Sequence, residues 1–204
     1  NLAAGFASVV SGGAVNRAIG SAATISGGVV NYAGGSYSTV SGGSFNNSAG
    51  EDATIGGGKQ NSASGSMGTV SGGFHNVASD TGAVVGGGAY NKARGVYSTV
   101  GGGGSAYAFD SNTSIGAYST VSGGKQDDAT VQESAIAGGT FNTASGQASF
   151  VGGGSSNRAG GASSVVGGGL LDTASGHYST VPGGRNNTAW GNYSTWLTRA
   201  RCAF

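Results

Sequence analysis

Hydrophobic and small side chains recur along this chain at a fixed interval of 15 residues. In segment 35–49, GSYSTVSGGSFNNSA, Gly stands at place 1, Ser at 4, Thr at 5, Val at 6, a Gly pair at 8 and 9, Asn at 12 and a small residue at 14. Place 6 is Val or Ile in every unit until the last, where Trp196 takes it. Self-similarity at so short a period is typical of a solenoid, in which successive coils stack on one another.

The alternation of side chains around place 5 predicts a β-strand with one buried face. Residues two apart on a strand share a face, so places 4 and 6 point to one side and places 3 and 5 to the other. Place 4 holds only Ser, Ala or Gly, whereas place 3 accepts Tyr37, Met67 and Glu133. We therefore expect places 4 and 6 inside each coil and places 3 and 5 at its surface.

A turn and a second short strand complete each unit. Two adjacent glycines let the backbone turn sharply at low steric cost, and the Asn at place 12 can cap local backbone groups or form a ladder between coils. The small residue at place 14 allows the second strand to approach the first closely, so we expect it inside. Fifteen residues are too few for a strand–helix unit, which needs roughly thirty. The sequence predicts an all-β fold, a parallel β-solenoid (β-roll) of about thirteen 15-residue coils in one domain, 1–204.

Two segments depart from the repeat. The interval between Gly95 and Gly116 is six residues too long, and we assign the excess to a loop at 110–115. Asn112 lies in this predicted loop and begins an Asn-Thr-Ser sequon, so it is a candidate for glycosylation, with ordinary turn chemistry as the alternative. The atypical terminal coil, 191–204, predicts either a cap or an end-to-end contact with a neighbouring chain, made by Trp196, Arg199, Arg201 and Phe204.

The first residues match the end of an earlier coil, so we expect unpaired strand edges there that invite another chain. A repeated contact between unlike ends that does not close into a ring produces a filament. The expected partner is therefore the chain itself, in a head-to-tail filament or a homotrimer.

Composition narrows the possible functions. Glycine makes up 45 of the 204 residues and is phased with the repeat, unlike glycine in a disordered linker. Only 8% of residues are charged and the net charge is +1, which disfavours an electrostatic nucleic-acid binder. No apolar run is long enough for membrane insertion. His75 and His177 lie far apart in the stack, and no calcium or phosphate motif is present. We expect no enzymatic activity, no cofactor and no metal site.

Segment 38–43, STVSGG, followed by Asn46-x-Ser-x-Gly50, resembles the head repeats of YadA-like trimeric autotransporter adhesins, and so does segment 164–169, SVVGGG, followed by Asp172-x-Ala-x-Gly176. Those repeats read roughly S-V-A-I-G and then A-x-A-x-G, and related modules occur in phage tail fibres. The resemblance covers nearly the whole chain. It implies a left-handed parallel β-roll and an adhesive role at the cell surface as an extended trimer. The present repeat is about one residue longer and has a Gly pair at the turn.

The leading hypothesis is a non-enzymatic, extracellular or cell-surface structural repeat protein that forms an adhesive rod or fibre. The alternative is an ice- or glycan-binding solenoid. That alternative depends on an outward ladder of hydroxyl groups at place 5, with tyrosines at place 3 able to stack on sugars of surface glycans. The threonines of this predicted ladder are Thr24, Thr39, Thr54, Thr69, Thr99, Thr120, Thr180 and Thr195.

Overall fold

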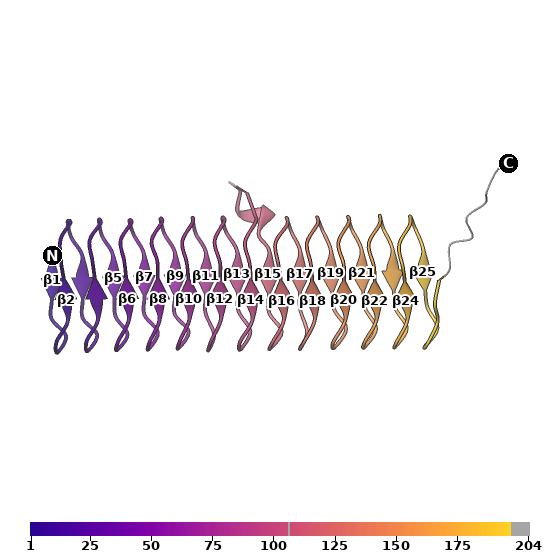
Figure 1. Ribbon diagram of the computed structural model, residues 1–204, viewed down its shortest axis with the longest axis horizontal. Coiled ribbons are helices and arrows are strands. Elements are labelled where there is room, and N and C mark those ends of the chain that lie inside the picture. Colours follow the sequence, from indigo (N-terminus) through magenta and orange to yellow (C-terminus); the bar gives the residue numbers. More distant parts are fainter. Residues whose placement is uncertain (106, 197–204) are drawn as a thin grey trace.

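The computed structural model describes residues 1–105 and 107–196, which form one parallel β-solenoid of about twelve coils (Figure 1). The coils lie side by side along one axis, with β1 at one end of the rod and β25 at the other. The all-β prediction is confirmed. In the described residues the one helical element is a short 3₁₀ turn, η1 (Ala108–Asp110).

Each coil contributes one strand to each of two sheets. The thirteen-stranded sheet contains places 13 and 14: β1 (Leu2–Ala3), β3 (Arg17–Ala18), β5 (Tyr32–Ala33), β7 (Asn47–Ser48), β9 (Ser62–Ala63), β11 (Val77–Ala78), β13 (Lys92–Ala93), β15 (Thr113–Ser114), β17 (Asp128–Ala129), β19 (Thr143–Ala144), β21 (Arg158–Ala159), β23 (Thr173–Ala174) and β25 (Thr188–Ala189). The twelve-stranded sheet contains places 5 and 6: β2 (Val9–Val10), β4 (Thr24–Ile25), β6 (Thr39–Val40), β8 (Thr54–Ile55), β10 (Thr69–Val70), β12 (Val84–Val85), β14 (Thr99–Val100), β16 (Thr120–Val121), β18 (Ala135–Ile136), β20 (Phe150–Val151), β22 (Val165–Val166) and β24 (Thr180–Val181).

All strand pairs are parallel and keep the repeat in register. Val40 lies opposite Ile55, and Ala63 lies opposite Ala78. A third ladder of single bridges joins the residues at place 10, such as Ser44 with Lys59. Because every rung shifts by one repeat, residues at the same place form a column along the rod.

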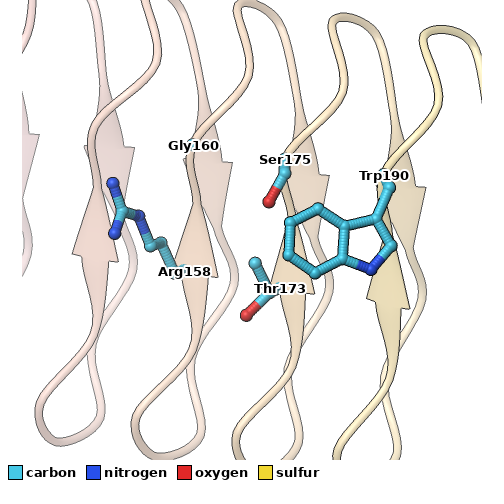
Figure 2. A pocket seen from close by; sticks show the side chains of 5 residues that line it. All are labelled: Arg158, Gly160, Thr173, Ser175 and Trp190. Atoms are coloured by element: carbon cyan, nitrogen blue, oxygen red, sulfur yellow. The ribbon is translucent and has the colours of Figure 1, made fainter.

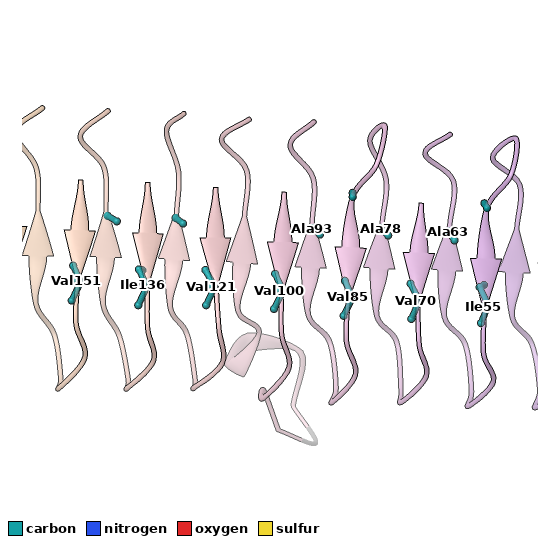
Figure 3. Close-up of a cluster of buried hydrophobic side chains, with 14 of the residues drawn as sticks. Ile55, Ala63, Val70, Ala78, Val85, Ala93, Val100, Val121, Ile136 and Val151 are labelled. Carbon is teal, nitrogen blue, oxygen red and sulfur yellow. The ribbon is translucent and has the colours of Figure 1, made fainter. Parts of the chain in front are cut away.

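The core is a narrow double column of side chains between the two sheets (Figure 3). Val or Ile at place 6 faces the Ala at place 14, as in Val85 and Ala93, and both are fully buried. Place 4 is buried as well, as Ser98 and Ala53 show. The predicted inside places are therefore confirmed, and only small residues fit beside the one branched side chain in each coil.

A ladder of buried asparagines at place 12 holds the turn of each coil against the next. In Asn46, Nδ2 donates to the carbonyl oxygens of Gly42 in its own coil (2.9 Å) and Gly58 in the next coil (3.0 Å). Oδ1 of Asn46 accepts a hydrogen bond from the backbone N–H of Asn61 at 3.0 Å. The amide thus satisfies three backbone groups that would otherwise be buried without partners.

The turns place many residues other than glycine in the left-handed region. Tyr37 at place 3 has φ 58° and Phe45 at place 11 has φ 57°, and equivalent residues repeat in most coils. Each costs roughly 1–2 kcal/mol relative to right-handed backbone. Their N–H groups compensate by donating across coils, from Tyr37 to the Ser21 carbonyl (2.7 Å) and from Phe45 to the Val29 carbonyl (3.0 Å).

The predicted position of the insertion, 110–115, is wrong. Thr113–Ser114 is strand β15, paired with β13 and β17, and Asn112 occupies place 12 of the asparagine ladder. By count the extra residues are 105–110, between places 10 and 11, and η1 within this segment projects from the rod (Figure 1). The error arose because Ala108 falls at place 14, where the repeat has a small residue, when the register is continued from Gly95 without a break.

Polar contacts attach this loop to the next coil. Asp110 is buried, its Oδ1 lies 3.1 Å from Lys125 Nζ, and its Oδ2 accepts a hydrogen bond from Ser105 Oγ. The hydrogen bond from Ser105, together with the contact and charge of Lys125, lowers the pKa of the Asp110 carboxyl below its ordinary value. The carboxylate is therefore ionised and anchors the loop.

Two rungs of the asparagine ladder are aspartates, Asp127 and Asp172. Oδ1 of Asp127 accepts from Asn142 N–H at 2.8 Å, but its buried Oδ2 has no hydrogen-bond partner. Oδ2 occupies the position where an Asn Nδ2 donates to glycine carbonyls, so an ionised carboxylate there faces other acceptors. Burial raises the pKa of the Asp127 carboxyl above its ordinary 3.8.

We predict that Asp127→Asn raises stability at neutral pH by about 1–3 kcal/mol, because Nδ2 supplies the missing donor. The folded protein holds the Asp127 proton more tightly than the unfolded chain. Wild-type stability therefore falls as pH rises from about 3.8 through the raised pKa. The advantage of the variant should be larger at pH 7 than at pH 4 in urea unfolding. The control Asn46→Asp should lower stability at pH 7, and an Asp127→Asn variant no more stable than wild type contradicts the assignment.

Candidate binding surfaces

The outer face of the twelve-stranded sheet carries the threonine row, defined as the residues at place 5. Thr39, Thr54 and Thr69 lie opposite one another on adjacent strands and are half-buried, with one side at the surface. Place 7 on the same face is small, as in Ser41 and Gly56, so the row stands on a flat strip. Adjacent hydroxyl groups repeat at about the strand spacing of 4.7–4.9 Å.

The threonine row is divided into two parts. From Thr24 to Thr120 only Val84 interrupts it, and Thr180 pairs with Thr195 near the far end. Between these parts, place 5 is apolar: Ala135, Phe150 and Val165. The structure therefore places all eight predicted threonines in one column but gives an uninterrupted hydroxyl array only over short stretches.

Tyrosines at place 3 line the corner that precedes the threonine row. Where two occupy successive coils their rings stack, with centroids 5.7 Å apart for Tyr97 and Tyr118 and 5.0 Å apart for Tyr178 and Tyr193. These side chains are exposed. They supply flat apolar surface with a polar tip, which is suited to binding at a wet surface.

A shallow depression of about 410 Å³ lies on the outer face of the other sheet, near its β25 end (Figure 2). Its lining comes from three successive coils: Arg158 and Gly160, then Thr173 and Ser175, then Trp190. Register alone brings them together, because Arg158 lies opposite Thr173 in the ladder. We call this the β21–β25 depression. Sequence reasoning missed it, although Trp190 is the one aromatic residue at place 15.

The structure places the candidate glycosylation site, Asn112, inside the coil. Its side chain is fully buried, and Nδ2 donates to the carbonyl oxygens of Gly102 (2.9 Å) and Gly124 (2.8 Å). Attachment of a sugar at this nitrogen would break one rung of the ladder and requires an access path that the folded coil does not provide. The sequon here is a consequence of the Asn of the repeat.

Of the residues predicted to form an end-to-end contact, the structure describes one. Trp196 is half-exposed (45%) and its N–H donates to the Thr180 carbonyl at 2.9 Å. Arg199, Arg201 and Phe204 lie outside the described residues, so the contact stays a prediction.

The two histidines of the described part of the chain lie apart from each other and make separate contacts. His75 stacks on Tyr90 with ring centroids 5.0 Å apart, and Nδ1 of His177 accepts from the Ala162 N–H at 3.3 Å. Within residues 1–105 and 107–196 no three His, Cys, Asp or Glu side chains lie close enough together to hold a metal ion. Over the same residues, no helix has the length and apolar character needed to cross a membrane.

Comparison with known proteins identifies no family. No protein-family description matches the chain, and no curated protein matches it. The resemblance to YadA-like head repeats therefore rests on the repeat residues and on the parallel solenoid fold alone.

We predict that Thr39→Lys combined with Thr69→Lys leaves the fold intact, because both side chains lie at the surface and the coil of Thr54 separates them. Thermal unfolding followed by circular dichroism should show a change of less than about 1 kcal/mol. The matched control is Val40→Lys with Val70→Lys in the same two strands. Those side chains point inward, so buried charges should cost several kcal/mol and prevent stacking there. If the Thr39→Lys, Thr69→Lys variant instead unfolds, the threonine row is covered by another chain in the native protein.

Proposed function

We propose that this chain is a non-enzymatic structural repeat protein that forms an adhesive rod at an extracellular location or cell surface. The observation that carries the proposal is the separation of constant and variable positions. The inward places are nearly the same in every coil, whereas the outward places 3, 10, 11 and 13 change from coil to coil. Such a framework specifies a shape and leaves its surface available for contacts.

The dimensions support a spacer or fibre role. Twelve coil-to-coil steps at about 4.8 Å give a rod about 58 Å long. Hydrogen bonds between neighbouring coils run along this rod, which makes it resistant to bending and stretching. The proposed partners are other copies of the chain, in a head-to-tail filament or a homotrimer, and surface glycans or another extracellular ligand. The balanced charge favours neither nucleic acid nor an anionic surface.

We predict that purified chain imaged by electron microscopy forms thin unbranched threads, or closed trimers with parallel rods. Size-exclusion chromatography with light scattering gives the mass of the species before imaging. A monodisperse monomer at about 10⁻⁵ M and above would contradict self-assembly. A control with Val85→Asp, which places an unpaired charge in the thin core, should lose the rod shape itself and not only the assembly.

A second candidate function is ice binding, which is favoured by the threonine row. Four threonines on consecutive strands, Thr24 to Thr69, stand in register beside small residues at place 7. This is a flat, regular array of hydroxyl and methyl groups over four coils.

We predict for this candidate that wild-type chain slows ice recrystallisation and shapes ice crystals at micromolar concentration. The variant Thr39→Lys with Thr69→Lys should lose at least about 90% of that activity while remaining folded, because the two lysines disrupt the flat strip. The matched control is Thr143→Lys with Thr173→Lys on the other sheet, where the same charges should leave the activity unchanged. Absence of activity in the wild type rejects ice binding.

A further inference from the structure

We propose that the β21–β25 depression binds an acidic sugar, a pyranose ring that carries a carboxylate. This inference names a ligand class for the adhesive role proposed above, but it depends only on side chains of one chain. It concerns the sheet opposite the threonine row, so it is independent of ice binding.

The depression exists because the residue at place 15 of one coil is a glycine. Gly160 at place 15 leaves a gap, and a Cβ there would meet its nearest atom, Nε of Arg158, only at 3.5 Å. Gly34 occupies the same place near the start of the rod, but the ring of Tyr32 lies over it and fills the space. The two sites differ because place 13 is Arg in one coil and Tyr in the other.

Trp190 forms one wall of the depression (Figure 2). Its side chain is 76% exposed, although burial of a Trp side chain is strongly favourable. The indole extends beside Thr173 and Ser175. The apolar C–H face of a pyranose ring can pack on such a flat surface while its hydroxyl groups remain available for hydrogen bonds. This combination of an apolar wall and a few polar groups is typical of small-molecule sites.

Arg158 forms the opposite wall of the depression, two coils from Trp190 along the rod, and its guanidinium extends away from the indole (Figure 2). Its side chain is exposed, and in the described part of the chain the one ion pair joins Lys125 to Asp110 elsewhere. The guanidinium is planar and matches a carboxylate with two parallel hydrogen bonds. Thr173 and Ser175, on the floor between the walls, can donate to and accept from sugar hydroxyl groups.

The geometry thus selects three ligand features together. The indole requires a flat apolar face, the guanidinium requires a planar anion, and the floor requires hydroxyl groups beside them. A uronic-acid residue of an acidic polysaccharide has all three. A neutral sugar lacks the anion, and a peptide carboxylate lacks the adjoining ring of hydroxyl groups.

The test is isothermal titration calorimetry of the full chain with tetragalacturonate and, as a matched ligand, its fully methyl-esterified form. The ester keeps the rings and removes the charges. We expect the acid to bind with a millimolar or tighter dissociation constant and the ester at least about tenfold more weakly, because it loses the charge-assisted pair. Equal binding of both ligands, or no binding of the acid at about 10 mM, overturns the inference.

Variants identify the site. Arg158→Gln and Trp190→Ala should each weaken binding of the acid by about tenfold or more, and Arg158→Tyr should abolish it by filling the gap as Tyr32 does over Gly34. Arg185→Gln is the control, because Arg185 is exposed at place 10, outside this sheet. Circular dichroism verifies that each variant is folded. Unchanged binding in the three site variants overturns the assignment, whereas rods seen by electron microscopy without any sugar binding would leave the structural proposal intact.

Discussion

Hydrogen bonding between consecutive coils is the interaction on which this structure depends. One branched side chain and two small ones per coil are too little apolar surface to order fifteen residues, so no coil is stable alone. Stability comes from the neighbours, through two strand ladders, the bridges at place 10 and the asparagine ladder. The glycine at place 9 belongs to the same constraint. A Cβ at Gly43 would collide with the carbonyl oxygen of Gly58, so a larger residue would separate the coils.

The close stacking of coils limits which side chains each position of the repeat can hold. Inward places must be small or uniformly branched, because each one contacts its equivalents above and below. Outward places contact mainly other outward side chains, so Arg158 and Tyr32 can occupy the same place with opposite consequences for the surface. Function is therefore to be sought in short runs of successive coils at one face. The threonine row and the β21–β25 depression are both of this kind.

Periodicity was sufficient to predict the strands and the buried places, since Val85 or Ala93 can belong only to an interior column of small residues. It was insufficient for three features. The left-handed backbone at Tyr37 and Phe45 has no residue-type signature, because inter-coil hydrogen bonds impose it. The insertion was misplaced because Ala108 within the loop matches the small residue of place 14 when the register is continued. The depression joins different places of three coils, and a comparison of equivalent places cannot reveal such a combination.

The loop at 105–110 shows how the rod accommodates extra chain. It leaves between places 10 and 11, and the next strand, β15, returns to the register of β13 as if nothing intervened. The loop leaves and rejoins the rod at the same corner of one coil. The free-energy cost of the insertion is therefore the entropy of closing the loop, and the stacking of the coils is unchanged. The same corner recurs about every 4.8 Å on the rod. The solenoid therefore offers regularly spaced insertion sites along one edge. A peptide inserted at one of these corners lies at a fixed distance, a multiple of the coil spacing, from a peptide inserted at another.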